Sequence, residues 1–179
     1  GDVYKRQDTI PAIVKELTKE EAVITMVDAN LQRENLLPSE KAFAYKMKAA
    51  AMKAQGKRTD LTSSQVATKS DTATTIGQQL GESRDQVYRY IRLTYLIPEL
   101  LKMVDEQRIA FTPAVEISYL PEREQRVLID EIEYTDATPS LSQAQRLRKF
   151  SNQGRLSVDT VFAVLSEEKP NQKEQVKFM

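Results

Sequence analysis

The chain contains no cysteine, no histidine and no tryptophan among its 179 residues. Without cysteine it has no disulfide and no thiol nucleophile, and without histidine it has no imidazole general base. The two absences together exclude every metal site built from Cys or His ligands. Only five glycines occur, and none of them forms a Walker-type or dinucleotide-binding loop. The composition therefore excludes these kinds of catalytic and metal site, and we expect a protein that is not an enzyme and has no resident cofactor or metal.

The chain also lacks an excess of charge of either sign. Lysine plus arginine number 26, as do aspartate plus glutamate, so the formal net charge is zero. Any basic surface that attracts nucleic acid must therefore be local. A hydrophobic content of 40% with 29% charged residues is typical of a globular protein. No apolar run approaches the roughly 18 residues of a membrane-spanning helix, and no secretory signal is visible, so we expect a cytoplasmic protein without a membrane partner.

Both ends of the chain resemble cut ends. The sequence does not begin with Met, and residues 2–7 (DVYKRQ) resemble the translated adapter of transposase-based sequencing libraries. We predict that residues 1–7 are an adapter artefact and exclude them from the fold. The last five residues, QVKFM, carry no helix stop, which predicts a truncated C-terminus.

Helix signals dominate the rest of the chain. Ser or Thr followed three residues later by Glu or Gln is a capping box, which marks a helix start, and it occurs at 18–21, 83–86 and 140–143. Apolar residues then recur at helical spacing. Pro113 and Pro121 are expected at the first position of their helices. Helices are expected at about 18–34, 38–56, 72–80, 84–97, 98–107, 113–119, 121–134, 140–153 and 158–167.

One short run is typical of a strand. Residues 10–14 (IPAIV) are β-prone, and their proline suits an edge strand. The predicted fold class is mainly α: a multi-helix bundle that contains a helix-turn-helix, with one strand as the remnant of a truncated N-terminal α+β domain. The predicted domains are an N-terminal remnant at 8–36, a central helix-turn-helix domain at 37–137 and a truncated helical extension at 138–179, with residues 57–70 as a loop or weak helix.

The strongest pattern lies between residues 73 and 93. Gly77 is small enough to let a second helix approach closely, and Gly81 can adopt the positive φ of a sharp turn. Val87 and Tyr90 follow at the spacing that packs the second helix against the first. These positions together predict a helix-turn-helix.

The second helix of this motif carries side chains suited to DNA. At about 100° per residue, Val87, Tyr90 and Ile91 share the inner side. Arginine can bridge guanine, glutamine can pair with adenine, and an acid can accept from cytosine. The alternative is an ordinary helical hairpin with a surface pair of Asp85 and Arg89. The predicted DNA-facing residues are Arg84, Asp85, Gln86, Tyr88, Arg89 and Arg92, with Ser83, Thr74 and Thr75 placed for phosphates.

The neutral chain is divided into a basic and an acidic part. Residues 41–58 contain six basic side chains and no acid, whereas residues 99–136 contain ten acids and four bases. This asymmetry predicts that the basic segment lies near nucleic acid, with Lys46 and Lys53 as phosphate contacts. The alternative is a solvated lysine face on an alanine-rich helix.

Three stretches together resemble ParB-type partition proteins of plasmids and integrated mobile elements. They are NLQRENL at 30–36, TIGQQLGESRDQVYRYIRLTYLIPELL at 75–101 and IAFTPAVEISYL at 109–120. The resemblance covers about two-thirds of the chain, from residue 10 to residue 133. It implies binding of double-stranded DNA at a palindromic centromere-like site, a homodimer in the full-length form and a ParA-type ATPase as partner. The implied role is plasmid or chromosome partition, in a bacterial protein associated with the nucleoid or plasmid.

Many members of that family also bind CTP with magnesium in an N-terminal domain. The family's Glu-Asn-x-x-Arg motif is matched here by Asn30 and Arg33, but Ala29 stands at the glutamate position, with Asp28 one residue earlier. The family's other nucleotide motifs would lie upstream of Ile10. We therefore expect this chain to bind no CTP, and we treat the two matching residues as a vestigial nucleotide site.

Three other functions remain open from the residues alone. The same helix-turn-helix would serve a transcriptional regulator without a partition role. The acidic 99–136 part would serve a helical protein–protein adaptor that binds no DNA. A nucleotide-dependent switch would need the upstream motifs.

Overall fold

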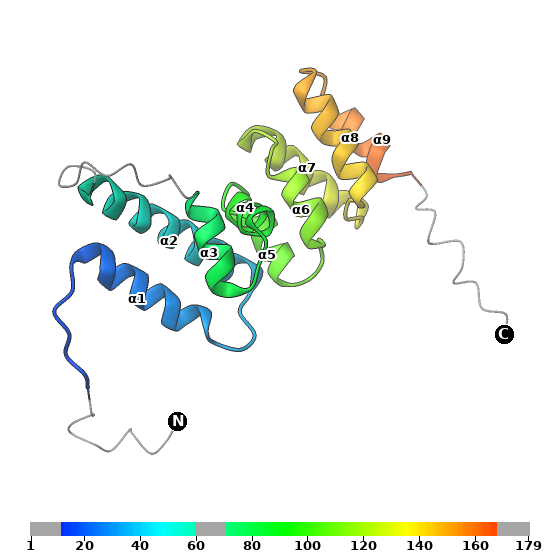
Figure 1. Cartoon of the computed structure of the whole chain (residues 1–179). Helices are drawn as coiled ribbons and strands as arrows, with labels where there is room; N and C mark the ends of the chain where they lie inside the picture. The colour runs from blue at the N-terminus through cyan, green and yellow to red at the C-terminus, as the bar shows by residue number, and fades with distance from the viewer. Residues whose placement is uncertain (1–11, 60–70, 168–179) are drawn as a thin grey trace, which may run out of the picture.

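The computed structural model describes residues 12–59 and 71–167. Within these ranges the chain forms α-helices and no strand, and the helices follow one another from α1 at one end of the molecule to α8 and α9 at the other (Figure 1). The expected mainly helical fold is confirmed. The helices are α1 Lys19–Leu31, α2 Pro38–Thr59, α3 Thr72–Leu80, α4 Arg84–Leu93, α5 Pro98–Asp105, α6 Phe111–Ile117, α7 Glu122–Thr135, α8 Leu141–Asn152 and α9 Val158–Leu165.

Local capping explains where several of these helices begin. The capping boxes at Thr18 and Ser140 are both complete, as expected. At α4 only half of the expected box forms. The Ser83 hydroxyl accepts from the Gln86 N–H at 3.1 Å, but the Gln86 side chain accepts from Arg89 Nη1 at 3.4 Å instead of returning to Ser83.

The expected N-terminal strand is wrong for the residues that the structure describes. Residues 12–17 have no regular structure, and Ile13 and Val14 are almost fully exposed. A β-prone run needs a neighbouring strand to pair its backbone, and none occurs in the described ranges. Residues 10 and 11 lie outside them.

Several helix boundaries also differ from expectation, and α4 ends at Leu93 where residue 97 was expected. Helix α2 continues through Gly56 to Thr59, because a glycine inside a helix costs only about 1 kcal/mol relative to alanine and does not by itself end it. Pro113 is the third residue of α6, and Pro121 is the N-cap of α7. A proline is tolerated anywhere in the first turn, where its missing N–H has no intrahelical partner.

Two apolar clusters hold the helices together. The small cluster joins α2, α3 and α4 through the buried residues Tyr45, Ala73, Ile76 and Val87. The large cluster has 19 buried residues, drawn from α2 and from α4 to α9. The Tyr90 ring packs against both clusters, with its centroid 5.6 Å from that of Tyr45 and 4.7 Å from that of Phe111.

Two lysines of α2, one buried and one partly buried, reinforce the small cluster. Lys48 is 1% exposed, and its Nζ donates to Asp28 Oδ1 at 2.5 Å and to Gln79 Oε1 at 2.6 Å. It therefore ties α2 to both α1 and α3. Lys41 forms an ion pair with Glu82 in the α3–α4 turn, and burial beside that carboxylate raises the pKa of Tyr45 well above its ordinary value.

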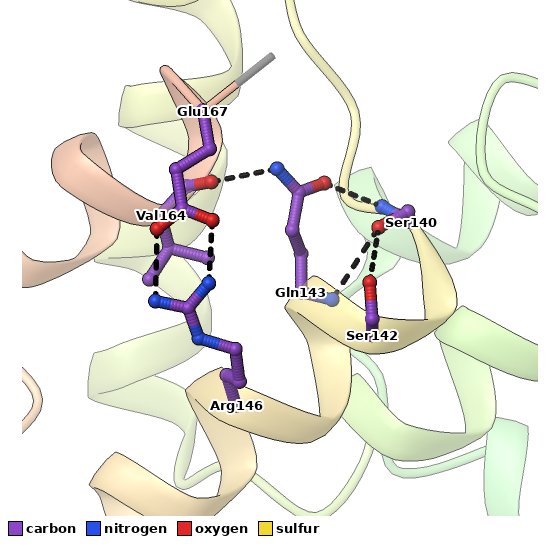
Figure 2. A network of polar contacts seen from close by, with 6 residues as sticks. All are labelled: Ser140, Ser142, Gln143, Arg146, Val164 and Glu167. Atoms are coloured by element: carbon purple, nitrogen blue, oxygen red, sulfur yellow. Dashed lines mark hydrogen bonds and ion pairs between the residues drawn. The ribbon is translucent and has the colours of Figure 1, made fainter. Parts of the chain in front are cut away.

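A polar network closes the C-terminal pair of helices. Gln143 is buried, and its Nε2 donates to the Val164 carbonyl at 2.6 Å while its Oε1 accepts from the Ser140 N–H at 2.9 Å. Arg146 forms a two-pronged ion pair with Glu167, at 2.5 and 2.8 Å. Figure 2 shows both interactions crossing from α8 to the end of α9. Together with Ala144 and Leu147 in the large cluster, they attach α8 and α9 to the same core as α5–α7.

No helix in the described ranges has the length and apolarity to cross a membrane.

Candidate nucleic-acid interface

Two glycines shape the tight turn that joins α3 and α4. Gly81 ends α3 in the left-handed conformation, with φ of +70°, which glycine adopts without a steric penalty. Gly77 lies against the same turn, and a Cβ atom there would be 2.5 Å from the Glu82 carbonyl oxygen. The turn therefore depends on Gly77 for close approach and on Gly81 for its change of direction.

One carboxylate organises the beginning of α4. Asp71 is the N-cap of α3, and its Oδ2 accepts from Arg84 Nε at 2.5 Å and from the Tyr88 hydroxyl at 2.8 Å. The hydrogen bond from Tyr88, followed by those from Arg84 and the Ala73 N–H, lowers the pKa of Asp71. The same carboxylate raises the pKa of Arg84. Both predicted DNA-facing side chains are thus held beside the start of α3.

The next arginine of α4 is directed toward α6. Arg89 Nη2 donates to Thr112 Oγ1 at 2.8 Å, and its guanidinium carbon lies 5.0 Å from the centre of the Phe111 ring. Its Nη1 contact with Gln86 aligns the two predicted base-reading side chains. Arg89 is half-buried, so it is less exposed than an outward-pointing residue on an isolated helix.

The last arginine of α4 is held at the end of α6. Arg92 donates from Nε to Ser118 Oγ at 3.2 Å and from Nη2 to the Ser118 carbonyl at 2.7 Å. Its guanidinium carbon also lies 4.5 Å from the Tyr95 ring centre and 4.0 Å from that of Tyr119. These contacts fix the direction of the guanidinium group.

Several of these side chains line one shallow hollow of about 410 Å³: Tyr88, Arg89, Ile91, Arg92, Tyr95 and Tyr119. The fold thus brings together three predicted residues, Tyr88, Arg89 and Arg92. It adds two tyrosines that are 55% and 42% exposed, Tyr95 and Tyr119. Guanidinium groups beside exposed rings can donate to phosphates and interact with bases.

Not every basic side chain of α2 is directed toward solvent. Lys41 and Lys48 are engaged inside the fold by their carboxylate partners. Lys46 is exposed, and its Nζ donates to Thr94 Oγ1 at 3.2 Å and lies 5.2 Å from the Tyr95 ring centre. Lys53 is also exposed, two turns further along α2. The two predicted phosphate contacts, Lys46 and Lys53, are thus the exposed lysines of this segment, while the side chains of Lys57 and Arg58 lie outside the described ones.

The remaining predicted phosphate contacts occupy the start of each helix. Thr74 and Thr75 are half-buried in the first turn of α3. Ser83 is exposed, although its hydroxyl oxygen already caps α4. Asp85 is exposed in the first turn of α4.

The two matched nucleotide-motif residues lie elsewhere. Asn30 and Arg33 are exposed near the end of α1 and line a separate hollow of about 260 Å³. Asp28, the carboxylate nearest to the motif, is paired with Lys48. A triphosphate needs several converging donors, so these residues do not fit a nucleotide with its magnesium. The rest of the lining is mainly apolar: Met26, Val27, Leu31, Leu36, Glu40, Phe43, Ala44 and Met47. Within the described ranges no group of three or more acidic residues could hold a metal ion.

Sequence reasoning missed Asp71, Tyr95 and Tyr119. Asp71 could have been found, because an aspartate directly before a helical run is an N-cap signal. The two tyrosines could not, since they meet their cations only through packing. Arg148, for example, reaches Tyr119 only through the packing of α8 on α6, where its guanidinium carbon lies 3.6 Å from the ring centre.

No protein-family model matches the chain, and no curated protein is significantly similar to it.

Proposed function

We propose that the chain binds double-stranded DNA sequence-specifically, with α3 and α4 acting as a helix-turn-helix. The observation that supports this most is the turn itself, in which Gly81 reverses the chain and Gly77 allows the start of α4 to lie against α3. A helix of α4's dimensions fits the major groove of B-DNA, which is about 12 Å wide. Arg89 and Arg92 of α4 extend toward α6, whereas Arg84 lies beside the start of α3.

Base recognition on this proposal comes from the first two turns of α4. In helix-turn-helix complexes the N-terminal residues of the second helix contact base edges. Gln86 and Arg89 are paired with each other in the free protein, so their donors and acceptors are already aligned. Arg84, Ser83 and the threonines of α3 then contact phosphates and set the register.

Partition of a plasmid or chromosome is the biological role that we propose for this binding, on the resemblance to ParB-type proteins. A homodimer would cover a palindromic site, and a ParA-type ATPase would act on the complex. A transcriptional regulator would use the same surface, and a ParA-type gene beside the coding sequence would favour partition.

The test is a selection of random duplexes with the purified chain at two salt concentrations. We expect an enriched half-site or palindrome. Gln86→Ala and Arg89→Ala should each relax the preference at one position, at a cost of roughly 1–3 kcal/mol. Arg126→Ala on α7, an exposed residue paired with Glu122, serves as the control and should change nothing. Equal losses on selected and random DNA would contradict a reading role for α4.

A specific observation favours a second candidate, the protein–protein adaptor. Tyr134 on α7 is 78% exposed and Phe162 on α9 is 43% exposed, and their ring centres are 6.1 Å apart. Asp130 and Glu133 are exposed on the same helix. Failure of the chain to bind any duplex at low salt would favour this candidate over the first.

A further inference from the structure

Cations and aromatic rings alternate along a path that leaves α4 and crosses the fold. Lys46 lies against Tyr95, Arg92 lies against both Tyr95 and Tyr119, and Arg148 lies against Tyr119. Each contact is between 3.6 and 5.2 Å from cationic atom to ring centre. We call these five residues the ladder. They come from α2, α4, the segment after α4, the segment after α6, and α8.

The ladder presents positive charge that carboxylates inside the fold only partly neutralise. Arg148 donates to Glu116 at 2.8 Å, but no ion pair in the described ranges includes Lys46 or Arg92. The fixed orientation of Arg92 matters as well, because a long side chain that is already ordered loses less conformational entropy on binding. Its bonds to Ser118 use two of the guanidinium donors and leave others for a ligand.

The ladder lies where a recognition helix leaves the groove. Arg92 is in the last turn of α4, and Tyr95 comes after the end of that helix. Since base contacts come from the beginning of such a helix, its far end and the segment after it face the sugar–phosphate backbone. We infer that the ladder is a second, sequence-independent contact surface for the phosphates of duplex DNA, extending the footprint from α2 to α8. This inference rests on the proposed DNA binding.

The test measures the affinity of the full chain for a fluorescent duplex of random sequence over a series of salt concentrations. Removing one phosphate contact lowers the slope of log affinity against log salt by about one. Arg148→Gln should therefore weaken binding to every duplex equally and make the complex about threefold less sensitive to a rise from 50 to 200 mM salt. Lys46→Gln, a change at an exposed position, should act in the same way. The matched control is Arg126→Gln, which should leave affinity and slope unchanged.

The rings have a separate readout. Tyr119→Leu removes the ring that orients Arg92 and Arg148, so affinity for all duplexes should fall, whereas Tyr119→Phe should keep it. If the ring acts through Arg92, the losses in Tyr119→Leu and Arg92→Gln should not add in the double variant. Additive losses, or a Tyr119→Phe variant that binds as weakly as Tyr119→Leu, would show that the ring does not act by orienting the arginines.

The two proposals fail in distinguishable ways. If the chain selects a sequence but Arg148→Gln and Lys46→Gln leave affinity and salt slope unchanged, the ladder is wrong and the recognition helix stands. If no sequence is selected but both variants weaken random duplex, the ladder stands and specific recognition fails. A larger loss on single-stranded DNA than on duplex would assign the exposed tyrosines to base stacking and overturn the ladder as a duplex contact.

Discussion

The two halves of the molecule are held together by different kinds of contact. The α1–α4 half has four fully buried apolar or aromatic residues in its cluster and depends on Lys48 and Lys41 to join its helices. The half that extends from α5 to α9 rests on the large cluster, whose 19 buried residues also include Ala42 of α2 and Leu93 of α4. The Gln143 network closes this half (Figure 2). A small apolar core gives less hydrophobic stabilisation, so directional polar contacts make up a larger share in the first half.

Helix α4 belongs to both halves. Val87 is buried in the small cluster and Leu93 in the large one, while Tyr90 packs between them. The arginines of α4 are held by Asp71 at one end and by α6 at the other. The candidate interface is therefore assembled on the border between a weakly and a strongly supported region. Its geometry should respond to damage in either half, but in different ways.

The largest effect should come from truncating each core. Ile76→Ala and Leu147→Ala remove fully buried side chains, and each should lower the free energy of unfolding by about 2–5 kcal/mol. Ile76→Ala should lower hydrogen-exchange protection mainly in α3 and α4, because its cluster supports only that half. Leu147→Ala should lower protection across α4–α9. Equal and uniform losses in both variants would show that the two clusters form one cooperative unit.

A smaller loss should follow removal of the buried ammonium group. Lys48→Met keeps most of the side-chain volume but leaves Asp28 and Gln79 without their donor. We expect the free energy of unfolding to fall by about 1–3 kcal/mol, as for other buried groups that lose a partner. Denaturant titration measures it, and Lys53→Met on the exposed side of the same helix should stay within about 0.5 kcal/mol of the parent. If the two variants are equally stable, the contacts of Lys48 do not stabilise the α1–α4 half, and this difference between the two halves is wrong.

Alanine substitutions at Gly77 and Gly81 should disturb the α3–α4 turn in different ways. Gly77→Ala places a Cβ against the Glu82 carbonyl, so the turn must move, at a cost of about 1–3 kcal/mol. Gly81→Ala meets no atom within 4 Å and carries only the left-handed backbone penalty of about 1–2 kcal/mol. Amide chemical shifts of α4 should change widely in the first variant and only around the turn in the second. The reverse pattern would contradict the role assigned to Gly77.

The smallest effect should be a dependence of stability on pH through Asp71. Its pKa is lowered from 3.8 by Tyr88 and Arg84, so the carboxylate stabilises the fold fully above pH 3.8 and loses that contribution as pH falls through its lowered value. Asp71→Asn keeps a side chain that can cap α3 but removes the charge. The parent should be more stable than this variant near pH 6, and the difference should shrink below pH 3.8. A difference that does not change with pH would contradict the contribution of the charge.

Much of the helical framework could be predicted because its signals are local. The caps at Thr18 and Ser140 and the left-handed Gly81 each act within a few residues of chain. The strand at residues 10–14 could not be judged in this way, because a strand is stable only with a partner. The surroundings of the lysines in α2 could not be predicted for a similar reason. Charge alone does not say which lysines are covered by neighbouring helices.

The sequence by itself determined approximately where the helices lie and how Gly81 makes the α3–α4 turn. Only the tertiary structure decided that Lys48 is buried against Asp28 while Lys46 stays exposed, and that Arg148 meets Tyr119 beside Arg92. The physical reason is the range of the interactions. Hydrogen bonds that cap a helix join residues three or four apart, whereas burial and cation–ring contacts join side chains that are distant in the chain and meet only when the helices pack.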